Sequence, residues 1–180
     1  MTYVILGFLC LSSLTQYDIL KALKMRISPF YQPSLGSIQA TLKKLLADGL
    51  ITQEAETQAG RKKKIFSITD EGRKAFETWM LLNDADMSLS KMDAELSTRL
   101  FFLGLMPPED RNRIVGTAAA FFTKTLAECT QAYSAYRQTE YPQEMAGVVR
   151  FQLKTLSYAI HQLSSSLEWL HDFQKELEEA

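Results

Sequence analysis

The sequence predicts a mainly α-helical protein with one small β-hairpin in its first half. Three observations lead to this fold class. Apolar residues recur at helical spacing along most of the chain, two strand-like runs flank residues 60–64, and residues 149–177 repeat apolar side chains at heptad spacing. The chain is 46% hydrophobic and 23% charged, so a disordered, collagen-like or Gly/Pro-rich protein is excluded.

The first part of the chain predicts short helices. Residues 3–11 are almost entirely apolar, as in a buried helix, and a turn follows at residues 11–14. Thr15 is a candidate N-cap because its hydroxyl can accept a bond from a free amide of the next helix. Tyr17, Ile19 and Leu23 lie on the apolar stripe of that second helix. The prolines in residues 28–33 end it.

A third helix is predicted to begin after Ser34, another N-cap candidate, and to stop at Gly49. Its apolar positions at helical spacing predict a buried face. The opposite face is small, polar and basic. It comprises Ser37, Gln39, Ala40, Lys43, Lys44 and Ala47.

Two strands are predicted at residues 50–55 and 65–69, joined by a turn region at residues 60–64. This turn region contains four consecutive cationic residues, Arg61, Lys62, Lys63 and Lys64. Thr69 is a candidate N-cap for a helix that begins near Glu71.

The remainder is predicted to be helical. A helix is expected from about residue 90 to 103, with Ser90 and Asp93 spaced like a capping box. Pro107 and Pro108 start the next helix, and the final helix starts around Pro142.

The final helix carries an apolar seam whose steps alternate between four and three residues. The seam comprises Val149, Leu153, Leu156, Ile160, Leu163, Leu167, Leu170 and Leu177. This spacing favours coiled-coil pairing, so these residues are predicted to mediate dimerisation. Trp169 and Phe173 form a second apolar set. Two apolar faces require two partners, another helix of the same chain and a second subunit.

Charge is distributed unevenly although the chain carries a net charge of only −1. Residues 1–75 contain 11 Lys and Arg against 6 Asp and Glu, a net charge of +5, and residues 76–180 carry −6. A basic half suits a polyanionic partner. The near-neutral sum therefore does not exclude nucleic-acid binding.

Three helices followed by a hairpin with a basic tip are typical of a winged helix-turn-helix. Polar side chains on the third helix can meet base edges, and its lysines and the basic run can meet phosphates. The predicted DNA-contacting residues are Tyr17, Ser34, Ser37, Gln39, Thr41, Lys43, Lys44, Arg61, Lys62, Lys63 and Lys64. The alternative for each is a role in packing or in a solvated surface.

The chain contains the stretches YVILGFL, QYDILKAL, FYQPSLGSIQATLKKLLADGLI, GRKKKIFSITDEGRKAF and ELSTRLFFLGLMPPEDR. In these stretches it resembles the PadR-like transcriptional regulators. The resemblance implies a winged-helix dimer held by C-terminal helices, a symmetric operator and, in some members, control by a small ligand or a partner. Four positions depart from the family pattern: Gln16 stands in place of Gly, Leu35 and Ala40 in place of Pro, and Gln39 in place of Tyr. Gln39 alters the expected operator sequence rather than DNA binding itself, because Gln can read adenine.

The sequence lacks the Gly-rich phosphate loop, the nucleophile elbow and the paired-His motif of common enzyme classes, so an enzyme is not expected. Neither a metal site nor a cofactor is expected, because Cys10, Cys129, His161 and His171 lack companions at ligand spacing. No apolar run is long enough to span a bilayer, so the expectation is a cytoplasmic protein without a membrane partner.

We therefore expect a winged helix-turn-helix domain at residues 1–80 and an α-helical dimerisation domain at residues 81–180. The expected function is a homodimeric regulator, first a repressor, that binds double-stranded DNA at a palindromic operator. Activation by the same fold, or a protein-interaction module with the winged helix as scaffold, are the alternatives. A ligand-sequestering protein is a third hypothesis. The aromatic residues of the helical half leave open either a hydrophobic core or a pocket for a small aromatic or hydrophobic effector.

Overall fold

The computed structural model describes residues 1–27, 34–58, 61–81 and 87–179, with the backbone alone described at residues 26, 27, 56–58, 61 and 62. The chain divides into two compact units. The first comprises Met1–Leu81 and Asp93–Pro107, and the second comprises Leu82–Met92 and Pro108–Ala180.

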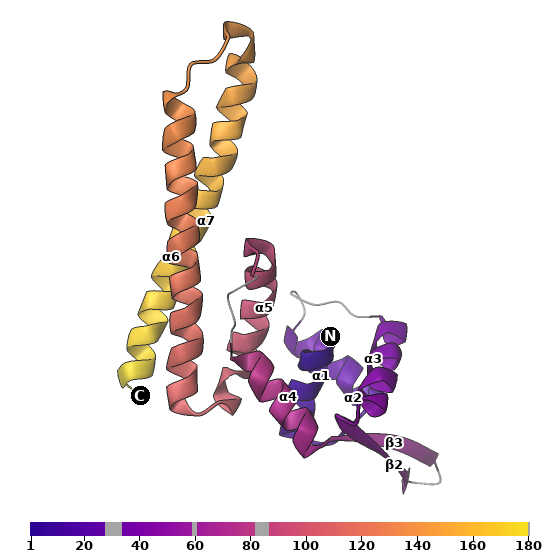
Figure 1. Ribbon diagram of the computed structural model, residues 1–180. Helices are drawn as coiled ribbons and strands as arrows, with labels where there is room; N and C mark the ends of the chain where they lie inside the picture. Colours follow the sequence, from indigo (N-terminus) through magenta and orange to yellow (C-terminus); the bar gives the residue numbers. More distant parts are fainter. Residues whose placement is uncertain (28–33, 59–60, 82–86, 180) are drawn as a thin grey trace. The chain divides into compact units, whose positions relative to one another are not determined.

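The first unit combines short helices with a small antiparallel sheet (Figure 1). Its helices are α1 (Thr2–Leu11), α2 (Gln16–Ala22), α3 (Leu35–Ala47), α4 (Asp70–Met80) and most of α5 (Leu89–Phe102). Its strands are β1 (Leu14–Thr15), β2 (Ile51–Gln58) and β3 (Arg61–Ile68), in the order β1-β3-β2. This arrangement confirms the predicted fold class, mainly helical with a winged helix-turn-helix at the N-terminal end.

Three predicted N-caps begin helices of this unit. Thr15 Oγ1 accepts a bond from the backbone N–H of Asp18 at 3.2 Å, and the Asp18 carboxylate accepts the Thr15 N–H in return. Ser34 Oγ accepts from Ser37 N at 3.1 Å, and Thr69 Oγ1 accepts from Gly72 N at 3.0 Å. Each hydroxyl satisfies an amide that lacks a partner within the helix, so these helix starts are determined locally.

Two details of the sequence prediction are corrected. The strands continue beyond residues 50–55 and 65–69, because backbone pairing extends to Gln58 and Arg61. The four cationic residues therefore belong to β3 rather than to the turn. Helix α5 begins one residue before the predicted Ser90, and Ser88 Oγ accepts the N–H of Lys91 at 3.3 Å, so the cap is Ser88.

The core of the first unit joins α1, α4 and the second half of α5. Phe8, Phe76 and Phe102 are buried, and their rings meet edge to face at centroid distances of 5.4 and 5.7 Å. Arg99 is buried beside them. Its guanidinium lies 4.1 Å from the Trp79 ring centroid, donates two bonds to the Trp79 carbonyl and pairs with Glu95 at 2.6 Å. These contacts compensate the cost of burying a cation and fix α5 to the end of α4.

Burial alters the pKa of Arg99. Desolvation lowers this pKa, whereas the hydrogen bond that Arg99 donates to Glu95 and the electrostatic effects of Glu95 and Tyr3 act to raise it. Desolvation is the largest of these influences, so the pKa of Arg99 lies below its ordinary value.

The second unit contains a long helical hairpin of α6 (Pro108–Gln138) and α7 (Ala146–Glu179), whose two helices run side by side (Figure 1). A single 3-10 turn at Gln143–Met145 leads into α7. Ile114, Val115 and Phe122 of α6 are buried, as are Leu163 and Leu170 of α7. Two helices connected by a short segment lie close enough to bury apolar stripes against each other, which explains the hairpin.

Candidate nucleic-acid interface

Helix α3 separates a buried face from an exposed polar face. Ile38, Leu42 and Leu45 lie in the core, whereas Gln39 and Lys43, each one residue after a buried position, are exposed on a different side of the helix. Gly36, Ala40, Lys44 and Ala47 are exposed as well. The small residues on this face leave the helix backbone accessible, and the long side chains beside them can reach outward.

Three hydroxyls predicted to face DNA are engaged within the helix. Ser34 Oγ caps the helix, as described above. Ser37 Oγ donates to the Ser34 carbonyl at 2.7 Å, and Thr41 Oγ1 donates to the Ser37 carbonyl at 2.8 Å. Ser37 and Thr41 are also half-buried. Gln39, Lys43 and Lys44 are thus the predicted α3 residues whose donors project into solvent.

The sequence prediction placed Tyr17 on the apolar stripe of the second helix, but its ring at the start of α2 is 72% accessible and lies in solvent, unlike the buried Ile19. Lys21, one turn further along α2, is exposed too. The sequence prediction omitted Lys21, although its spacing of four residues from Tyr17 places both on one side of the helix. Asp18 between them is engaged in the capping box, since Thr15 Oγ1 donates to its carboxylate at 2.6 Å.

The basic run occupies the first half of β3. Lys63 and Lys64 are exposed, and because consecutive strand residues alternate, their side chains leave opposite faces of the hairpin. In the backbone register Lys63 pairs with Glu56 and Lys64 with Ala55. The side chains of Arg61 and Lys62 lie outside the described residues. A hairpin with cations on both faces can lie along a phosphate backbone.

The predicted heptad seam faces α6 of the same chain. Val149, Leu163 and Leu170 are buried. The other members are half-buried, and they are Leu153, Leu156, Ile160, Leu167 and Leu177. The seam therefore contributes to the α6–α7 hairpin, and its contact with a second subunit stays a prediction.

A second apolar stripe on α7 is exposed. It comprises Val148, Phe151, Tyr158 and Trp169. Their spacings of 3, 7 and 11 residues correspond to whole numbers of helical turns, so the four side chains share one side of the helix. Sequence reasoning found Trp169 but missed the other three, because the seam dominated the pattern. Exposed apolar stripes of this kind mark interaction surfaces.

No group of three or more His, Cys, Asp or Glu in the part of the chain that the structure describes is arranged to hold a metal ion. Burial raises the pKa of the Cys10 thiol, with the nearby Arg73 lowering it and Glu77 raising it, so Cys10 is a poor nucleophile near neutral pH. Of the helices described, none is both long and apolar enough to cross a bilayer.

Residues of the first unit match a known protein family. Residues 5–78 match the model of the Transcriptional regulator PadR-like family. A curated relative, the negative transcriptional regulator PadR of Bacillus subtilis (strain 168), is 32% identical over 80 residues. That match spans 44% of this chain and 44% of the relative, so the chain matches less than half of that protein's length.

Solved structures with similarity to this chain include Bacillus subtilis PadR in complex with operator DNA. That structure is 20% identical with a TM-score of 0.46, and the match covers 98% of each chain. Another is smu.1604c from Streptococcus mutans UA159, which is 25% identical with a TM-score of 0.43 and is matched over 95% of this chain and 96% of its own.

Proposed function

Residues 5–78 of this chain belong to the PadR-like family of transcriptional regulators, and on this premise we propose that the protein is a sequence-specific DNA-binding regulator. The observation that carries the proposal is the exposed face of α3, where Gln39, Lys43 and Lys44 project beside small residues. The exposed Lys63 and Lys64 of the β2–β3 hairpin add a second cationic element to the same unit.

In the proposed complex α3 enters the major groove. The Gln39 amide both donates and accepts, which matches the N6 and N7 atoms of adenine. Lys43 and Lys44 bind phosphates that flank the groove, and Tyr17 and Lys21 of α2 bind the neighbouring backbone. The basic half of β3 follows the phosphates beyond the site, where it adds affinity without reading sequence.

We propose that the regulator acts as a homodimer on a palindromic operator. The heptad seam of α7, together with its exposed stripe at Val148, Phe151, Tyr158 and Trp169, supports a helical interface with a second copy. Two-fold symmetry in the protein then requires an inverted repeat in the DNA.

The outcome we propose is repression, in line with the negative regulator to which the chain is similar. A small effector that shifts the paired helices would alter the half-site spacing that the dimer can span.

The test is the salt dependence of DNA affinity, measured by fluorescence anisotropy on an inverted repeat taken from the DNA beside the gene. We expect the logarithm of the affinity to fall linearly with the logarithm of the salt concentration. The double variant Lys63→Ala/Lys64→Ala should flatten this slope by about 0.9 for each phosphate that the protein no longer neutralises.

The matched control is Lys91→Ala/Lys124→Ala, which removes two exposed lysines from the second unit and leaves the slope unchanged. Binding no tighter than about 1 mM at low salt would contradict the proposal, since even non-specific DNA binders exceed that affinity. In that case a protein-interaction module becomes the better interpretation.

A further inference from the structure

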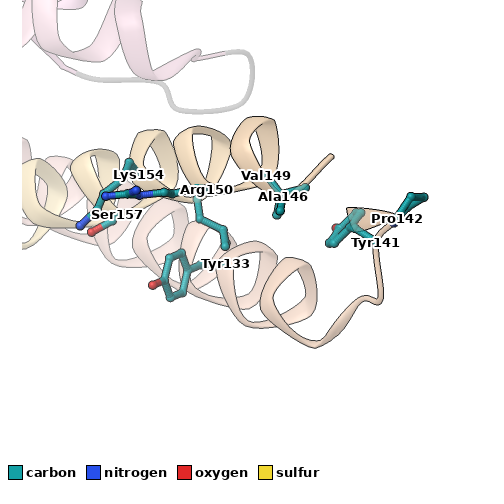
Figure 2. Close-up of a pocket in the computed structure, with 9 residues that line it drawn as sticks. Tyr133, Tyr141, Pro142, Ala146, Val149, Arg150, Lys154 and Ser157 are labelled. Atoms are coloured by element: carbon teal, nitrogen blue, oxygen red, sulfur yellow. The ribbon is translucent and has the colours of Figure 1, made fainter. Parts of the chain in front are cut away.

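A cavity of about 470 Å³ lies where α6 and α7 are connected. Its walls come from the end of α6, the connecting segment and the first turns of α7 (Figure 2). This volume falls in the range of small-molecule sites in proteins. The cavity belongs entirely to the second unit, so it is separate from the residues proposed to contact DNA.

One part of the cavity wall is apolar. Val149 is buried and Leu153 is half-buried, and both face the cavity together with Pro142. The rings of Tyr133 and Tyr141 complete this wall. Aliphatic and aromatic side chains around one space favour an apolar or aromatic ligand body, because its burial removes apolar surface from water.

Tyr141 is held in place by its neighbour Tyr136. The two ring centroids are 5.1 Å apart, and the Tyr136 hydroxyl donates a bond to Gln152 of α7. The connecting segment is thereby attached to both helices. A ligand would meet a wall that is formed before it binds, which lowers the entropy cost of binding.

The other part of the wall is cationic. Arg150 and Lys154 line the cavity one helical turn apart. Ser157 supplies a hydroxyl, and none of the described lining residues is acidic. Arg150 and Lys154 form no ion pair within the part of the chain that the structure describes, whereas Arg113 and Lys175 of the same unit are paired with aspartates.

These cations stand out against their surroundings, because residues 76–180 carry a net charge of −6. Two unpaired positive charges that flank an apolar cavity suit a ligand with an acidic head group. We propose that this cavity binds an amphipathic anion, an apolar or aromatic body that carries one carboxylate, sulfonate or phosphate. Arg150 and Lys154 bind the head group, and Tyr133, Tyr141 and Leu153 enclose the body.

This cavity is the proposed binding site for the effector of the regulator. The effect of the ligand on DNA binding rests on the proposed function, whereas ligand binding does not. A ligand that touches α6, α7 and the connecting segment stabilises the hairpin in proportion to its affinity and concentration. Binding itself requires no DNA, so it is measured on the protein alone.

The experiment is isothermal titration calorimetry of the full chain with three probes of the same ring system: 2-naphthoate, naphthalene-2-carboxamide and 2-naphthylmethylammonium. We expect one 2-naphthoate per chain, bound at least about tenfold more tightly than the neutral amide or the cation, because neither of these offers a carboxylate to the two cationic side chains. The variants Arg150→Gln and Lys154→Gln should each weaken 2-naphthoate binding about tenfold.

The control is Lys124→Gln, an exposed lysine of α6 outside the cavity, which leaves affinity for 2-naphthoate unchanged. Circular dichroism establishes that each variant is folded. The proposal is overturned if the three probes bind equally, if none binds at millimolar concentration, or if both cavity variants retain wild-type affinity. DNA affinity of Arg150→Gln and Lys154→Gln without ligand should match the wild type, so failure of DNA binding and failure of the cavity proposal are separate results.

Discussion

Gln39 and Lys43 present two different chemical groups on the exposed face of α3. Both are exposed on α3, one turn apart, while Ile38 and Leu42 beside them are buried. The amide can discriminate between base pairs, whereas the ammonium is a point charge that binds any phosphate. In the proposed complex, sequence preference therefore resides mainly in Gln39 and affinity mainly in the lysines.

The residue-scale prediction concerns Gln39. Gln39→Ala should relax the preference for one base pair in each half-site and cost about 1–3 kcal/mol of discrimination there, because alanine cannot form the two bonds to adenine. Competition binding with operators altered one position at a time measures this. Gln131→Ala, an exposed glutamine of α6, is the control with unchanged preference. If Gln39→Ala retains full discrimination at every position, α3 is not the reading helix.

At the scale of elements, the start of α4 is attached to the turn that follows α3. Thr69 Oγ1 donates to the Gly49 carbonyl at 2.8 Å, and the Thr69 N–H donates to the Leu50 carbonyl at 3.1 Å. Gly49 has φ +69°, a conformation that glycine adopts without strain. Gly72 packs so closely that a Cβ atom there would lie 2.0 Å from the Leu50 carbonyl oxygen. Close contact of backbone with backbone holds α3, β2 and α4 together.

Gly72→Ala should therefore destabilise the first unit by about 1–3 kcal/mol, because the helix start must shift away from β2. Urea denaturation followed by circular dichroism measures the loss of stability. Gly147→Ala is the matched control at the start of α7, where nothing lies within 4 Å of the added Cβ. It should be neutral or stabilising by up to about 1 kcal/mol. Equal stability of Gly72→Ala and the wild type would show that this close approach is absent in solution.

At the scale of the whole molecule, α7 carries two apolar surfaces. Its seam is used by α6, and its stripe of Val148, Phe151, Tyr158 and Trp169 remains exposed in the single chain. Phe151 is 70% and Tyr158 is 62% accessible, which is unusual for aromatic side chains on a long helix. A second copy that covers this stripe would complete the proposed dimer.

Phe151→Asp/Tyr158→Asp should convert the protein from twice the 20.5 kDa chain mass to the chain mass in light scattering at micromolar concentration, because charge on a buried interface is costly. Helix content should stay unchanged, since neither side chain belongs to the α6–α7 core. Ser164→Asp/His171→Asp places the same charges, also seven residues apart, at exposed positions off the stripe and should remain dimeric. A wild-type protein at the chain mass would refute the dimer, and a dimeric Asp variant would assign its interface elsewhere.

Much of the fold could be predicted from local sequence. Thr15, Ser34 and Thr69 act as caps because a hydroxyl meets an amide only three residues away. The buried face of α3 follows from helical periodicity, and the basic first part follows from counting charges. All of these depend on neighbours along the chain. The family match over residues 5–78 covers nearly all of four stretches that carry the resemblance, whereas the fifth stretch, at residues 95–111, lies outside it.

Long-range contacts decided the rest. The basic run became a strand because pairing with β2 continues to Gln58, and its own composition gives no sign of that partner. Likewise, heptad spacing predicted a paired helix at residues 149–177, but only the tertiary structure showed α6 against that seam and an apolar stripe left exposed. The cavity at Arg150 and Lys154 depends on Tyr133 and Tyr141, which approach only when the hairpin closes. The sequence by itself determined helices, caps and charge placement, because these arise within a few residues. Strand pairing, the segment that covers each apolar face of α7 and the cavity arise between segments far apart, so they were decided by the fold.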